Sequence, residues 1–158
     1  MRANATAIIA ALFLAEMTAT FESAMLYAAL PTLIDDFGDP IAAGWLVTIH
    51  MLVAAVSAVV AGRLGDICGR KQVMLVLLAL SAVGSVMSAV TANFGVVLAG
   101  RALQGLAAAV ISLNIGILRE QLPAERVPVA VGLMTTAAGA GVAVGLVLGG
   151  AIIDHFNW

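Results

Sequence analysis

Four ionisable side chains lie inside long apolar stretches of this 158-residue chain: Glu16, Glu22, His50 and Arg101. An ionisable group is costly to bury in hydrocarbon, so it normally faces a partner or a water-filled cavity. Dehydration disfavours the charged form of a carboxyl, whereas a nearby cation favours it. A carboxyl subject to both effects is suited to binding and releasing a proton. We therefore treat the four residues as candidates for proton coupling or substrate binding.

Three of the four are predicted to lie at one depth. Glu22, His50 and Arg101 are each seven to nine residues from one end of their apolar stretch, about 10–14 Å along a helix. The functional hypothesis is a shared polar cavity in which Glu22 and Arg101 could pair, and the alternative is a static buried ion pair. Glu16 precedes Glu22 by six residues, about 120° around a helix, so we expect the two acids to face different directions.

The composition places these residues in a membrane. The chain is 63% apolar and 10% charged, with a net charge of -2, whereas soluble domains average about 45–50% and about 25%. This excludes a soluble enzyme, a disordered chain and a nucleic-acid-binding protein. Low charge favours helices over a membrane β-barrel. We expect no enzyme, cofactor or metal site, because no catalytic constellation is present and the two histidines and one cysteine lie far apart.

The apolar stretches predict an all-α membrane protein with five transmembrane helices, since about 20 residues cross the hydrocarbon core. The helices are expected at about 7–30, 41–61, 73–91, 95–118 and 128–153, with a polar loop at 62–72. Pro31 and the acidic residues after it end the first helix. Arg2 before that stretch leaves a secretory signal as an alternative, although the two acids inside it favour a span.

Positive residues gather at alternate ends of the predicted helices. The six are Arg2, Arg63, Arg70, Lys71, Arg119 and Arg126, and the opposite ends have no Lys or Arg. The positive-inside rule then makes the N-terminus and the loop 62–72 cytoplasmic, and it places Trp158 on the far side.

Glycines recur in the last apolar stretch, at Gly132, Gly141, Gly145, Gly149 and Gly150. Residues four apart share a helix face, and glycine there allows another backbone to approach closely. We therefore predict a glycine interface on this helix.

The loop also contains glycines, at Gly62, Gly65 and Gly69, which permit tight turns. Asp66 is expected to cap the following helix or to bond Arg70. These features predict a structured hinge.

Four segments resemble signatures of the major facilitator superfamily. GRLGDICGRKQVM resembles the loop signature G-x-L-A-D-x-x-G-R-K, with Gly65 and Ile67 departing from it. The matching residues are Gly62, Leu64, Asp66, Gly69, Arg70 and Lys71. LAGRALQGLAAA resembles the fourth-helix signature through Arg101, Gln104 and Gly105.

The other two segments indicate a subfamily. The glycines of the last stretch resemble the antiporter signature G-x8-G-x3-G-P-x2-G-G, with Leu146 in place of its proline. ESAMLYAALP is similar to the L-D-x-T-x-x-N-x-A-L-P signature of the fourteen-helix drug–proton antiporters, with Glu22 in place of the aspartate.

The resemblance implies rocker-switch alternating access driven by proton exchange. It implies that Gly62, Asp66, Gly69, Arg70 and Lys71 form a conformational latch. It places Glu22 and Arg101 in proton coupling or substrate binding, and it makes the glycine interface the part that bends. The five helices would form most of an N-terminal six-helix bundle, and the missing C-terminal half or a partner chain would complete the transporter.

We therefore expect part of a proton-coupled multidrug efflux transporter in a bacterial inner membrane. Its partners would be a small lipophilic substrate, protons and the lipid bilayer. One alternative is a metabolite symporter or uniporter of the same fold. Another is a membrane scaffold or assembly subunit that does not transport.

Overall fold

The computed structural model describes residues 5–156, and the regular structure in this range is helical. The elements are α1 (Ala5–Phe37), α2 (Pro40–Cys68), α3 (Arg70–Ala89), α4 (Phe94–Gly105), α5 (Val110–Gln121) and α6 (Val127–Phe156). The short 3₁₀ helix η1 (Leu106–Ala109) joins α4 to α5, and η2 (Ala124–Arg126) precedes α6. Five segments are long and apolar enough to cross a membrane, with α4, η1 and α5 forming one of them. The predicted all-α architecture with five spans is confirmed.

Local capping explains the turn between the first two spans. Gly38 has a positive φ of 63°, which glycine adopts without strain, and its N–H donates to the Ile34 carbonyl at 3.0 Å. The Asp39 carboxylate then accepts a hydrogen bond from the Ile41 N–H at 2.8 Å, and Pro40 occupies the first turn of α2. Asn93 caps α4 in the same way, through the N–H groups of Gly95 and Val96.

The predicted loop at 62–72 is wrong. Helix α2 continues to Cys68 and α3 begins at Arg70, so only Gly69, with φ of 92°, interrupts the helix. Polarity marks where a helix leaves the hydrocarbon, but the helix's own hydrogen bonds continue beyond that point. Similarly, α1 runs past Pro31 to Phe37, where the fully buried Leu33 holds its last turns in an apolar cluster.

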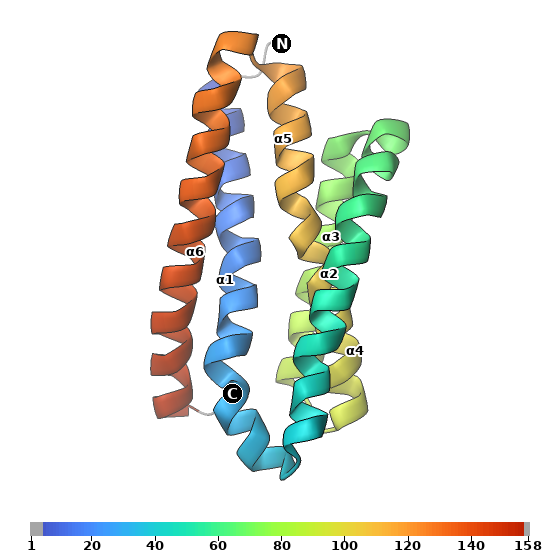
Figure 1. Cartoon of the computed structure of the whole chain (residues 1–158), viewed down its shortest axis with the longest axis vertical. Coiled ribbons are helices and arrows are strands. Elements are labelled where there is room, and N and C mark those ends of the chain that lie inside the picture. The colour runs from blue at the N-terminus through green and yellow to red at the C-terminus, as the bar shows by residue number, and fades with distance from the viewer. Residues whose placement is uncertain (1–4, 157–158) are drawn as a thin grey trace.

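The helices lie side by side along the long axis of the molecule, with α6 next to α1 and α2, α3 and α4 on the other side (Figure 1). The α2–α3 and α5–α6 junctions are at the same end. That end therefore holds five of the described cations, which lie in the terminal turns of their helices or in η2: Arg63, Arg70, Lys71, Arg119 and Arg126. Arg2 and Trp158 lie outside the described residues.

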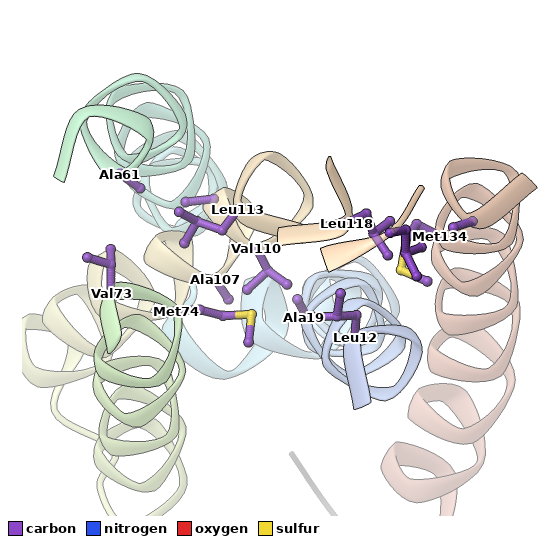
Figure 2. Close-up of a cluster of buried hydrophobic side chains, with 13 residues drawn as sticks. Leu12, Ala19, Ala61, Val73, Met74, Ala107, Val110, Leu113, Leu118 and Met134 are labelled. Atoms are coloured by element: carbon purple, nitrogen blue, oxygen red, sulfur yellow. The ribbon is translucent and has the colours of Figure 1, made fainter. Parts of the chain in front are cut away.

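A buried apolar cluster joins α1, α3, α5 and α6, and Leu12, Met74, Leu113 and Met134 belong to it (Figure 2). The outer surface is also apolar, with Ile67 81% and Val59 72% exposed. A surface of this kind suits contact with lipid. Since lipid is as apolar as the core, close backbone packing and hydrogen bonds must hold such helices together.

Glycines on α6 provide that close packing against α1. A Cβ at Gly145 would lie 2.7 Å from the Phe21 carbonyl oxygen, and one at Gly149 would lie 3.1 Å from the Ala28 Cβ. A Cβ at Gly141 would overlap the Thr20 hydroxyl.

Gly132 and Gly150 take no part in this contact, because a Cβ added at either position would meet no neighbouring atom within 4 Å, and their place in a glycine interface stays a prediction. Helix geometry gives the reason. Gly132 is nine residues from Gly141, about 180° around the helix, and Gly150 is about 100° from Gly149.

We expect Gly145→Ala to destabilise the protein by about 1–3 kcal/mol, because the added methyl overlaps α1 backbone. Gly150→Ala is the matched control and should be neutral, since that position is open. Thermal denaturation in detergent, followed by size-exclusion chromatography, measures the difference. Equal melting temperatures for the two variants would show that α1 and α6 do not pack through this contact.

Candidate functional site

Glu22 is held by two serines of the neighbouring span. Its carboxylate accepts hydrogen bonds from the hydroxyls of Ser81 and Ser85 on α3. These serines are four residues apart and so share one face of α3. Both carboxylate oxygens therefore have a hydroxyl donor, as a half-buried acid among apolar helices requires.

The hydrogen bonds continue from Ser85 to α4. The Gln104 Nε2 donates to the Ser85 hydroxyl at 3.1 Å, and the Arg101 Nη1 donates to the Gln104 Oε1 at 2.8 Å. Gln104 and Arg101 are both buried. We call the chain Glu22–Ser85–Gln104–Arg101, together with Ser81, the polar network.

The predicted direct pair between Glu22 and Arg101 is wrong, because no ion pair within 4.0 Å joins them in the described structure. The Gln104 amide stands between them. An amide can donate at one atom and accept at the other, so Gln104 satisfies Ser85 and Arg101 at the same time.

A cavity of about 210 Å³ adjoins the polar network. Its polar lining comes from Glu22, Ser85, Ser88, Arg101 and Gln104, and its apolar lining comes from Met25, Ala29, Ala89, Ile152 and Ile153. The Ser88 hydroxyl and the Arg101 Nε are buried without a hydrogen-bond partner. This cavity can therefore accept water or a polar group of a ligand.

His50 does not line this cavity, so the prediction of one cavity shared by three residues is correct only for Glu22 and Arg101. The His50 Nε2 lies 3.3 Å from the Ser23 hydroxyl, and its Nδ1 is buried without a partner. Ser23 is one residue after Glu22, about 100° around α1, which explains why His50 lies elsewhere.

A second cavity, of about 270 Å³, lies between α1 and α6. It is lined by Thr20, Ser23, Ala24, Tyr27, Val142 and Leu146. Its α1 residues lie roughly opposite Glu22 around the helix. The lining is uncharged, in contrast to that of the first cavity.

Glu16 is buried on a different face of α1 from Glu22, as their spacing predicts. The Asn114 Nδ2 of α5 donates to its Oε2 at 2.9 Å. Asn114 was not singled out from the sequence. Its position inside a span was a signal, because a buried amide in hydrocarbon also needs a partner.

The α2–α3 junction is tied to α5 by Arg70. Its Nη2 is 2.7 Å from the Asp66 Oδ1, so the predicted bond is present, and its Nη1 is 3.2 Å from the Glu120 Oε1. The guanidinium passes over Gly116, where a side chain would collide with it. Glu120 was missed, although its spacing of four residues from Gly116 places both on the face that Arg70 crosses.

Other residues of the predicted latch contribute less. Gly69 supplies the positive-φ break between α2 and α3. Gly62 faces open space, and Lys71 is exposed and absent from the ion pairs of the described residues. No three His, Cys, Asp or Glu side chains converge as a metal site requires in the part of the chain that the structure describes.

Comparison with known proteins decides the family, because a model of the Major Facilitator Superfamily matches residues 12–158. The chain belongs to this superfamily. Its relatives in the superfamily include an uncharacterized transporter of Bacillus subtilis, 32% identical over 96% of this chain and 35% of the relative. The tetracenomycin C resistance and export protein of Streptomyces glaucescens is 31% identical over 90% of this chain and 27% of its own length.

A riboflavin transporter of Clostridioides difficile is 28% identical over 88% of this chain and 31% of its own length. The chain thus spans about a quarter to a third of these relatives. Family membership makes it a multi-pass membrane protein, and the names of these relatives describe transport or export.

We expect Ser85→Ala to lower the free energy of unfolding by about 1–3 kcal/mol, because the Glu22 Oε1 loses its hydroxyl donor and the Gln104 Nε2 loses its acceptor. Ser88→Ala is the matched control, since that buried hydroxyl bonds to nothing and its loss should cost little. Unfolding in mixed micelles, followed by circular dichroism, compares the two. A larger loss for Ser88→Ala would contradict the polar network as described.

Proposed function

We propose that this chain is part of a proton-coupled secondary transporter that exports small lipophilic compounds. The polar network carries this proposal, because it holds an acid at the middle of a span beside a cavity. Relatives named for export, from Streptomyces glaucescens and from Aspergillus oryzae, support the direction of transport. The membrane is a bacterial inner membrane, with the cation-rich end of the bundle in the cytoplasm.

Proton binding at Glu22 would rearrange the polar network. The carboxylate accepts from Ser81 and Ser85, whereas a protonated carboxyl also has a hydrogen to donate. Ser85 accepts from Gln104, so a change at Ser85 reaches Gln104 and then Arg101. Protonation also removes the attraction between Glu22 and the Arg101 guanidinium. The proton is thereby coupled to the contacts of α1 with α3 and α4.

The other contacts would let the bundle respond as a unit. The glycines of α6 hold it closely against α1, so the two helices move together. Arg70 ties α2 and α3 to α5 through Asp66 and Glu120, and we assign the latch to this set. A second set of helices, from the same polypeptide or a partner chain, would form the other side of the substrate pathway.

A second candidate function is transport of a metabolite by the same fold. The relationship to a riboflavin transporter favours it, and so does the uncharged cavity between α1 and α6, which suits an uncharged ring. Transport assays distinguish the two, since net uptake of a metabolite rather than expulsion of a lipophilic compound would favour the second.

The decisive variant is Glu22→Gln, which keeps the shape of the side chain but cannot bind and release a proton. We expect it to abolish proton-driven efflux while the protein is still made and inserted. Glu125→Gln is the control, because this acid is exposed at the end of the bundle, and it should transport normally. The measurement is efflux from proteoliposomes that contain the native transporter, driven by an imposed pH gradient.

Unchanged efflux with Glu22→Gln would reject the assignment of this acid. Loss of efflux in both variants would indicate a general effect of removing charge rather than a specific role of Glu22.

A further inference from the structure

A second buried acid, Glu16, lies outside the polar network. Its side chain belongs to a residue that is only 4% exposed, between Leu12 and Ala19 of the main apolar cluster. Glu22 is six residues further along α1, about 9 Å along the axis and about 120° around it. The two acids therefore face different neighbours and do not share a site.

The partner of Glu16 is an amide that is only half satisfied. The Asn114 Nδ2 donates to the Glu16 Oε2 at 2.9 Å and to the Leu12 carbonyl at 3.3 Å. Asn114 is fully buried, and its Oδ1 has no hydrogen-bond donor. A buried acceptor without a donor, directly beside an acid, is a position where an O–H group would be stabilised.

Among the described residues, no cation of the helices packed against α1 lies within ion-pair distance of Glu16. Both ion pairs of the described residues belong to Arg70, at the end of the bundle. On α2, His50 bonds Ser23, and on α4, Arg101 bonds Gln104. Helix α6 has no ionisable side chain from 127 to 153, and Arg119 and Glu120 of α5 are exposed at its end.

An ionised Glu16 would thus be a buried charge with one amide donor and no counter-charge, which is costly. A neutral Glu16 removes both difficulties. It is not charged, and its O–H can donate to the Asn114 Oδ1 while the Asn114 Nδ2 donates back. The acid and the amide then satisfy each other through two hydrogen bonds.

We propose that Glu16 is a second proton-binding carboxyl, separate from Glu22, that holds its proton while α1 packs against α5 at Asn114. It releases the proton when water enters between these helices, because water then solvates the carboxylate. This inference rests on the proposed proton-coupled transport and extends it: two protons, one at each acid, are exchanged in a transport cycle.

The test uses the native transporter in proteoliposomes and counts the protons moved for each molecule of exported compound. With Glu16→Gln we expect transport to continue and the proton count to fall by one. An unchanged count would overturn the proposal for Glu16. Failure of the proposed function gives a different result. If transport is not proton-coupled, the unsubstituted protein itself moves no protons with its cargo.

Thermal stability provides a second readout. Glutamine is neutral and its N–H can donate to the Asn114 Oδ1, so Glu16→Gln should keep the melting temperature at neutral pH. Glu16→Leu, the matched apolar variant, should lower it, because it leaves the buried Asn114 amide without a side-chain partner. If Glu16→Gln melts as low as Glu16→Leu, or fails to fold, the native protein needs an ionised carboxylate at this position. That result would overturn the proposal.

Discussion

The constraint on which this structure depends is that a polar group among apolar helices must find its partner on a neighbouring helix. Glu22 meets that requirement by accepting hydrogen bonds from Ser81 and Ser85 of α3. The Ser85 hydroxyl in turn accepts a hydrogen bond from Gln104 of α4. Three spans are thereby fixed at one level by one carboxyl. The same constraint pairs Glu16 with Asn114 and Ser23 with His50, so these three polar side chains of α1 each contact a different helix.

Close backbone approach is the second requirement, and small residues meet it. Gly145 allows α6 to contact the Phe21 carbonyl, and Gly105 allows α4 to lie against the His50 carbonyl of α2. These contacts bring the helices near enough for short side chains such as serine to reach across. At the polar network itself, Gly84 allows α3 to lie against the Gly100 carbonyl of α4, near the hydrogen bond from Gln104 to Ser85.

Much of this could be predicted from the sequence, because hydropathy and charge act over whole helices. The five spans, the end that holds the cations and the bond between Asp66 and Arg70 follow from composition and spacing. The rotation of each helix does not, and for this reason Gln104 between Glu22 and Arg101, and the partner of His50, were not foreseen. Serines at 81, 85 and 88 recur on one face of an apolar helix, and that pattern was the available signal for α3.

The predicted loop at 62–72 shows a related limit of sequence analysis. Polarity indicates where the chain leaves the hydrocarbon, but the helices continue on either side of Gly69. The Arg70–Glu120 contact joins segments fifty residues apart, and it depends on how whole spans pack.

Glu22 is central to the proposed mechanism as the acid that exchanges a proton when cargo binds. Infrared difference spectroscopy of the native transporter, with and without an exported compound, tests this role most directly through the stretching band of the protonated carboxyl. We expect cargo to remove intensity from this band, and we expect Glu22→Gln to abolish the change assigned to this acid. A carboxyl signal that cargo does not alter, or one that is the same in Glu22→Gln, would contradict the proton-exchange role of Glu22.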